Sequence, residues 1–197
     1  MDMRWGNPNI NEKNEEAFLQ IGFTTPKSGK FVDETPLNIC LVIDRSGSMA
    51  GPPIENARQS ALTLASKLRE NEKAANQQKI SQIIKSIEVR GSTDLNGGLI
   101  KGYEVVAKYY QEKANNKVLL LTDVLTNTGV VDIESIVKNT NNYSRDHQIG
   151  VTLVAIGVEV NDALARQITQ SGKHSFHYVN DSEDIKKIFV DEIESIF

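Results

Sequence analysis

The fold of this 197-residue chain can be worked out from one stretch, Leu41-Val42-Ile43-Asp44-Arg45-Ser46-Gly47-Ser48-Met49. An apolar run ends here in the carboxylate of Asp44, and hydroxyls follow at Ser46 and Ser48. Apolar runs that end at a glycine-containing turn are typical of buried parallel strands. Pro52-Pro53 then opens a helical pattern, because proline is favoured in the first turn of a helix. The three polar side chains are therefore predicted on a strand-to-helix loop, at the edge where open α/β sheets bind ligands.

Asp44, Ser46 and Ser48 carry oxygen atoms at alternating positions, so they can converge on one point. Mg²⁺ prefers oxygen ligands and commonly keeps positions that are open or filled by water. Taken singly, the same side chains would also suit a helix cap or a turn. We predict that together they bind a divalent cation, with Mg²⁺ ahead of Mn²⁺ and Ca²⁺, and that further oxygen ligands lie later in the chain.

The rest of the chain alternates between helical and extended patterns. Apolar residues spaced for helices begin at Ile54 and again at Ile80, with a polar break at residues 68–79 between them. Further strands are predicted at 117–123, 150–158 and 174–179, and further helices at 95–110, 133–137, 161–172 and 182–196. Such alternation predicts a doubly wound α/β fold, with a mostly parallel sheet and helices on both of its faces.

Two parts of unequal length are predicted. Residues 1–36 form a polar lead-in with one strand at 17–24, where apolar side chains occur at every second position. Trp5 stands out from the polar residues around it and is a candidate anchor for the lead-in. Residues 37–197 form the α/β domain, which is long enough to bury a core of its own.

Composition excludes several classes of protein. A net charge of -4 argues against a nucleic-acid binder, because phosphate binding depends on clustered Lys and Arg. No apolar run approaches the roughly 20 residues that span a bilayer, and the beginning lacks a signal-peptide pattern. Cys40 is the only cysteine, and its place in an apolar strand indicates a core residue. The sequence indicates no compartment, since an excised domain would look the same.

Two later segments complete a pattern that begins at Asp44-x-Ser46-x-Ser48. Gly91-Ser92-Thr93-Asp94 precedes a predicted helix, and Leu121-Thr122-Asp123 ends a predicted strand. The three segments together resemble the metal-ion-dependent adhesion site of von Willebrand factor A domains, of the prokaryotic type. The resemblance covers residues 37–197 and implies a Rossmann-like fold. One position departs from the family pattern, because Val124 stands where the family has a glycine.

The resemblance implies a role for each of five side chains. Ser46 and Ser48 would ligate the cation directly, and Thr93 directly or through water. Asp44 and Asp123 would act mainly through bridging waters. The cation would then keep a vacant position for an Asp or Glu carboxylate of a partner protein, as in cell adhesion. The implied function is protein binding and not catalysis.

Two neighbours of these ligands are given secondary roles. Asp94 is expected to cap the following helix or to accept hydrogen bonds behind the ligands. Arg45 is expected to be a solvated residue at the rim of the site, where it could steer an acidic partner.

Two other functions remain open. A phosphotransferase of the haloacid dehalogenase type also begins with an aspartate at a strand end and uses Mg²⁺. That chemistry needs a second carboxylate two residues later for acid–base work, and this chain has Ser46 there. The third possibility is a structural domain of the same fold in which the site is unused.

The segment between Asp44 and Thr93 is shorter than the family pattern implies. It contains two helical patterns and no strand, whereas the family places two strands there. Without them, the strand that ends at Ile43 would lie near an open sheet edge, which could pair with another chain. Three explanations are considered: the sequence omits a segment between Lys73 and Ile80, the domain is trimmed, or the strand at 17–24 fills the vacant position.

Overall fold

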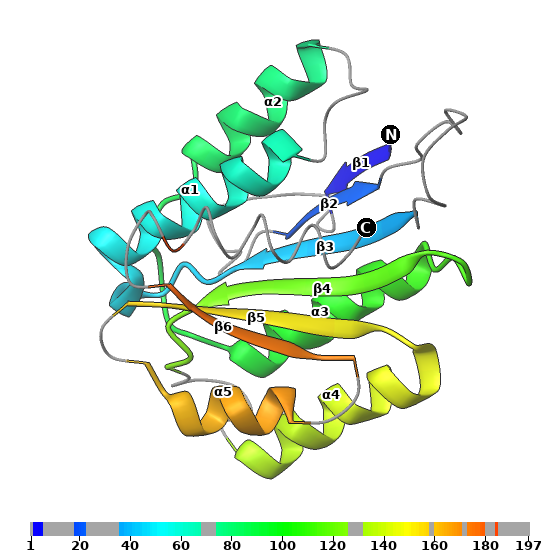
Figure 1. Ribbon diagram of the computed structural model, residues 1–197. Coiled ribbons are helices and arrows are strands. Elements are labelled where there is room, and N and C mark those ends of the chain that lie inside the picture. Colours follow the sequence, from blue (N-terminus) through cyan, green and yellow to red (C-terminus); the bar gives the residue numbers. More distant parts are fainter. Residues whose placement is uncertain are drawn as a thin grey trace.

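A six-stranded sheet in the order β1-β2-β3-β4-β5-β6 forms the centre of the described part of the molecule (Figure 1). The computed structural model describes residues 2–5, 18–22, 36–67, 74–125, 132–157, 160–170, 173–179 and 184. The strands are β1 Asp2–Trp5, β2 Phe18–Gly22, β3 Leu37–Ile43, β4 Asn115–Thr122, β5 Gly150–Ile156 and β6 Ser175–Val179. The helices are η1 Gly47–Met49, α1 Pro52–Lys67, α2 Ala74–Lys85, α3 Leu95–Lys108, α4 Ile133–His147 and α5 Asp162–Thr169.

The four strands from β3 to β6 run parallel, and helices connect them. Because their carboxyl ends lie at one edge of the sheet, the loops that follow β3 and β4 meet there. The register places Ile43 beside Leu121, so the two strands end level with each other. This arrangement brings the residues after Ile43 close to those after Leu121.

Helices cover both faces of the sheet, as Figure 1 shows. On one face α1 and α2 pack against Leu41, Leu119 and Val154. On the other, α3, α4 and α5 pack against side chains that include Cys40 and Val42. Adjacent strand residues belong to opposite cores because side chains alternate along a strand. The predicted doubly wound α/β fold is confirmed.

The strand β3 is not an edge strand in this structure. β2 pairs with it antiparallel, from Phe18 beside Val42 to Gly22 beside Asn38, and β1 pairs with β2. Between Asp44 and Thr93 the described residues form α1 and α2 and contain no strand. The third explanation therefore agrees with the structure, since the strand predicted at 17–24 lies beside β3.

Three elements differ from the sequence-based expectations. β1 is a strand that was not predicted within the lead-in. α2 begins at Ala74, inside the predicted polar break, because that segment is rich in Ala and Gln, which favour helices without an apolar stripe. α4 is 15 residues long and extends far beyond the predicted 133–137. Its buried face includes Thr140 and Ser144, so a search for apolar spacing misses its second half. The helix predicted at 182–196 lies outside the described residues, except for residue 184.

A polar network closes the sheet at the amino ends of β3 and β4. The Asn38 amide donates to the Val106 carbonyl at 2.9 Å and to Asn116 Oδ1 at 2.8 Å. The Asn116 amide donates to the carbonyl oxygens of Gln111 and Ala114. Both side chains are buried, so these bonds satisfy groups that water cannot reach. They also fix the turn that joins α3 to β4. Within the described ranges, the structure has no helix whose length and apolar character would carry it across a bilayer.

Candidate metal centre

The loop that follows β3 brings the first three candidate ligands together. The Asp44 N–H donates to the Leu121 carbonyl at 2.8 Å, which extends the pairing of β3 with β4 by one residue. Asp44 Oδ1 then accepts a hydrogen bond of 2.9 Å from the Ser46 N–H. This bond turns the chain sharply, as Asp side chains often do at loop starts. Ser46 Oγ and Ser48 Oγ lie 3.0 Å apart, so the loop places two hydroxyls side by side.

The segment before α3 is attached to this loop by two backbone hydrogen bonds. The Gly47 N–H donates to the Gly91 carbonyl at 3.3 Å, and the Arg90 N–H donates to the Arg45 carbonyl at 2.5 Å. Gly91 has a φ of 64°, a conformation that glycine adopts without strain. The attachment holds Thr93, which is buried, on the loop next to the two serines.

Asp94 has the capping role that was expected of it. Its Oδ1 accepts a hydrogen bond of 2.8 Å from the Gly97 N–H, in the first turn of α3. A side chain at position 97 would collide with this carboxylate, because a Cβ there would lie 2.6 Å from Asp94 Oδ2. Asp94 therefore caps its own helix and holds the neighbouring Thr93 at the start of α3.

Asp123 lies at the end of β4 and is almost fully buried. Burial raises the pKa of its carboxyl group, and the nearby negative charge of Asp44 raises it further. Hydrogen bonds from the Ser48 hydroxyl and the Leu125 N–H act in the opposite direction. The buried Asp123 carboxylate and the half-buried Asp44 carboxylate repel each other, and a bound dication would relieve that repulsion. The donor set therefore suits a cation.

Thr122 is a functional candidate that the sequence reasoning missed. Its hydroxyl donates to Asp44 Oδ2 at 2.6 Å and accepts a hydrogen bond of 2.9 Å from the Val124 N–H. The side chain has no exposed surface. The signal that could have identified Thr122 is a hydroxyl directly after the buried apolar run of residues 118–121. Thr122 holds the Asp44 carboxylate in place from the neighbouring strand.

Four of the five candidate ligands are thus joined by hydrogen bonds, and the fifth lies on an attached loop. The contacts link Ser46 to Asp44 and Ser48, and Ser48 to Asp123. Among the residues that the structure describes, no group of three or more His, Cys, Asp or Glu is placed to hold a metal. Any cation at this edge would therefore be held largely by hydroxyls. That these residues bind a metal stays a prediction.

Comparison with solved structures identifies the fold. A von Willebrand factor type A structure from Catenulispora acidiphila matches 90% of this chain and 44% of its own chain, with a TM-score of 0.61. The chain has the von Willebrand factor A fold. The sequence identity of this pair is 13%, so the likeness concerns the fold alone. A mutant of the PilB minor pilin from Streptococcus sanguinis is also similar, with a TM-score of 0.58 and 12% identity over 99% of this chain and 78% of its own.

Sequence comparison finds relatives of 27 to 30% identity and no matching protein-family profile. An uncharacterized protein of Synechocystis, sll0103, is 27% identical over 172 residues, which are 78% of this chain and 40% of the relative. The uncharacterized protein YfbK of Escherichia coli is 28% identical over 208 residues, at 93% and 35% coverage. Rat inter-alpha-trypsin inhibitor heavy chain H3 is 30% identical over 136 residues, at 56% and 15%. The chain spans between 15 and 40% of the length of these relatives.

The alignment with YfbK is longer than the part of this chain that it covers. The match to YfbK extends over 208 positions but covers only 93% of this 197-residue chain. YfbK therefore has residues for which this chain has no counterpart.

Arg45, expected to be a solvated residue at the rim of the site, is half-buried in the structure. The residue is only partly exposed, and its Nε is buried without a hydrogen-bond acceptor among the described residues. Burial lowers the pKa of its guanidinium, and the neighbouring charge of Arg90 lowers it further, against the opposing effect of Glu88. The backbone at Arg45 is also attached to residue 90, since the Arg45 carbonyl accepts a hydrogen bond from the Arg90 N–H.

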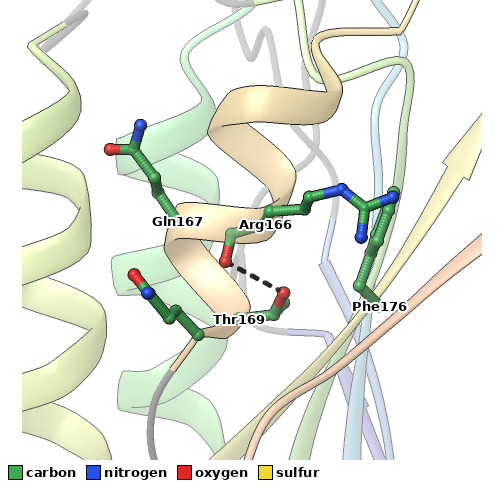
Figure 2. Close-up of a pocket in the computed structure, with 5 residues that line it drawn as sticks. Arg166, Gln167, Thr169 and Phe176 are labelled. Carbon is green, nitrogen blue, oxygen red and sulfur yellow. Dashed lines mark hydrogen bonds between the residues drawn. The ribbon is translucent and has the colours of Figure 1, made fainter.

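A hollow lies on α5 and β6, away from the candidate metal centre (Figure 2). It has a volume of about 490 Å³ and is lined by Arg166, Gln167, Thr169, Gln170 and Phe176. The Arg166 guanidinium lies 5.5 Å from the centre of the Phe176 ring and also pairs with Asp162. Phe176 is the second residue of β6, so the hollow lies toward the amino ends of the parallel strands. No residue singled out from the sequence lies there.

Proposed function

We propose that this chain is a protein-interaction module whose metal centre holds a divalent cation, Mg²⁺ above others, and through it an acidic side chain of a partner. The observation that carries the proposal is the 3.0 Å separation of the Ser46 and Ser48 hydroxyls, beside the buried Asp123 carboxylate. Mg²⁺ binds six oxygens at about 2.0–2.1 Å, so adjacent ligands at right angles lie about 2.9 Å apart. The two hydroxyls are therefore spaced as neighbouring ligands of Mg²⁺ would be.

The bonding of the two carboxylates supports an electron-poor cation. Asp44 accepts one hydrogen bond on each oxygen, from the Ser46 N–H and from the Thr122 hydroxyl. Asp123 accepts hydrogen bonds from Ser48 and from the Leu125 N–H. Each carboxylate is held by the protein and spreads part of its charge into these bonds. When bound, the cation would supply a Lewis-acidic position that attracts an external carboxylate.

The contacts of Ser46 argue against the phosphotransferase alternative. That chemistry requires an acid–base carboxylate two residues after the first aspartate. Here the position is a buried serine whose hydroxyl faces Ser48. We therefore propose binding and not catalysis as the function of the site.

Metal titration tests the proposal directly. Ligands that bind only the folded state stabilise it by about 2.7 kcal/mol at one hundred times the dissociation constant. For a chain of this length, that corresponds to a rise in Tm of roughly 5–10 °C. Saturating Mg²⁺ should produce such a rise over EDTA in wild type and none in Asp44→Ala or Ser46→Ala. The measurement is thermal unfolding followed by circular dichroism, with isothermal titration calorimetry for the affinity.

Asp146→Ala is the matched control, because it removes an exposed carboxylate on α4 that contacts only Arg145 among the described residues. It should keep the full response to Mg²⁺. Equal Tm values in Mg²⁺ and EDTA for wild type would refute the metal centre, as would an undiminished response in Asp44→Ala. Phosphatase turnover that disappears in Asp44→Asn would favour the enzyme alternative instead.

The partner-binding half of the proposal needs its own measurement. Immobilised wild-type protein should retain partner proteins from the source cell extract in Mg²⁺ and release them in EDTA. The Ser46→Ala, Ser48→Ala double variant should retain none of them. Retention that is equal in Mg²⁺ and EDTA would contradict a cation-mediated contact.

A further inference from the structure

Arg45 combines an unusual position with an unsatisfied donor. It lies between Asp44 and Ser46, two of the candidate ligands, and its side chain is partly buried. Its Nε–H has no acceptor within the described ranges, although it is shielded from solvent. Buried donors are rarely left without a partner, so an unpaired one calls for an explanation. Only Nε is shielded, because the side chain as a whole is half-buried, so the terminal guanidinium nitrogens can meet an acceptor supplied from outside the chain.

A second arginine lies beside the first. The two segments are held together by the bond from the Arg90 N–H to the Arg45 carbonyl, and the charge of Arg90 acts on the Arg45 guanidinium. Two guanidinium groups in proximity repel each other, which is unfavourable unless an anion is shared between them. The arrangement places two sets of planar donors at the loop that carries Gly91 and Thr93.

The nearby acidic groups do not satisfy this pair. Glu88 approaches Arg90 only to 4.0 Å, and both side chains are at least half exposed, so their attraction is weak. Glu55 pairs with Arg58, whose guanidinium also donates to the Ile87 carbonyl. Arg58 is thereby committed to holding the segment before Glu88. Arg45 and Arg90 are left as the cations with unused donors at this rim, among the residues that the structure describes.

We propose that Arg45 and Arg90 form a subsite for a second carboxylate, so that the partner is an acidic segment with two Asp or Glu side chains. One carboxylate reaches the metal centre and the other lies across the two guanidinium groups. This inference rests on the proposed function, because the first carboxylate is placed by the cation. Arginine suits the second position since its planar donors match both oxygens of a carboxylate.

Short synthetic peptides test the subsite. The probes are acetylated and amidated glycine hexapeptides that carry one Glu, or two Glu separated by none to three glycines. Binding is followed by ¹H–¹⁵N NMR titration in Mg²⁺ at 0.15 M NaCl, where long-range charge effects are screened beyond about 8 Å. At the best spacing, the second Glu should strengthen binding to wild type roughly tenfold, as a charge-assisted contact would.

The variants assign that gain to its residues. Arg45→Gln should abolish it and Arg90→Gln should reduce it, while both keep Mg²⁺-dependent binding of the single-Glu peptide. Arg45→Lys should recover only part of the gain, because a single ammonium group lacks the paired donors. Arg145→Gln removes the same charge from an exposed site on α4 and should behave as wild type. If Arg45→Gln fails to fold, as judged by its NMR spectrum, the half-exposed Arg90→Gln still provides the test.

The outcomes separate the two proposals. If the single-Glu peptide needs Mg²⁺ but a second Glu adds nothing at any spacing, the subsite is refuted and the metal centre stands. The same holds if the gain survives in both Arg45→Gln and Arg90→Gln. If no peptide shows Mg²⁺-dependent binding, the proposed function and the subsite fall together.

Discussion

Thr122 connects the two strands on which the candidate metal centre rests. Its hydroxyl donates to Asp44 at the end of β3 and accepts from the Val124 N–H just beyond β4. Because the side chain is fully buried, water cannot replace either hydrogen bond. The position of the Asp44 carboxylate therefore depends on a residue of the neighbouring strand. Residues that orient ligands in this way commonly affect metal affinity almost as strongly as the ligands themselves.

Thr122→Val keeps the shape of the side chain and removes the hydroxyl. We expect a loss of about 1–3 kcal/mol in unfolding free energy, because the half-buried Asp44 carboxylate and the buried Val124 N–H lose their partner. Mg²⁺ affinity should fall about tenfold or more. Chemical denaturation and calorimetric titration measure the two effects. Thr122→Ser retains the hydroxyl and should keep an affinity close to that of wild type. Unchanged affinity in Thr122→Val would show that Asp44 needs no such support.

The backbone conformation of Val124 could not be predicted from the sequence. The sequence placed a valine at a glycine position of the family pattern, but it did not predict the backbone that results. The residue has a φ of 62°, in the left-handed region, which is unfavourable by about 1–2 kcal/mol for a residue with a side chain. Its side chain is fully buried in the core with α3 and α4, and this burial offsets the strain. Packing against residues far along the chain, together with the bond from the Val124 N–H to the Thr122 hydroxyl, holds the conformation.

At the scale of elements, His174 links β5 to the start of β6. Its Nδ1 accepts a hydrogen bond of 2.9 Å from the Val151 N–H, so the ring must be unprotonated at that nitrogen. Burial lowers the pKa of His174 to about 4, and the nearby charge of Lys117 acts in the same direction. Protonation would put a second donor in place of the acceptor, so the hydrogen bond to the Val151 N–H would be lost.

The pH dependence follows from the sign of this shift. The folded-state pKa, about 4, lies below the unfolded value of 6.5, so the unfolded state takes up the proton first. The contribution to stability is complete above pH 6.5 and is lost as the pH falls toward 4, with an upper limit of about 3 kcal/mol. His174→Asn keeps an acceptor at the place of Nδ1 and does not titrate. Urea denaturation between pH 7.5 and 4.5 should show wild type losing more stability than this variant. Parallel losses in the two proteins would contradict the assignment.

The elements that could be predicted from sequence are those whose burial leaves an apolar pattern. β3, β5 and the second half of β4 are nearly continuous apolar runs, and Asp94 and Asn161 cap the helices that follow them. The second half of α4 could not be predicted, since small polar side chains occupy its buried face. The partial burial of Arg45 beside Arg90 could not be predicted either, because the two residues are 45 positions apart in the sequence.

At the scale of the whole molecule, different parts of the chain build the candidate metal centre and cover the strand β3. The parallel strands with their helices bring together Asp44, Thr93 and Asp123. The hairpin-like pair β1 and β2 comes from outside the segment in which the family places its extra strands, and it covers β3 instead. The candidate centre therefore depends on residues 37–125, while the protection of β3 depends on residues before 23. A substitution in one part of the chain can therefore alter the candidate centre without altering the cover of β3, and the reverse.

The pairing of β2 with β3 has a consequence for amide hydrogen exchange. Backbone N–H groups alternate sides along a strand, and the Asp44 N–H points to β4. The amides of Cys40 and Val42 therefore face β4, whereas those of Ile39 and Leu41 face β2. β1 and β2 are only 4 and 5 residues long, so they should open more often than the domain unfolds.

We accordingly expect the amides of Ile39 and Leu41 to exchange at least tenfold faster than those of Cys40 and Val42, a difference of about 1.4 kcal/mol in opening free energy. NMR-detected exchange at constant pH measures all four within one strand. Equal protection would mean that the amino-terminal pair opens only when the entire sheet does. In that case β2 would be as stable a part of the sheet as β4.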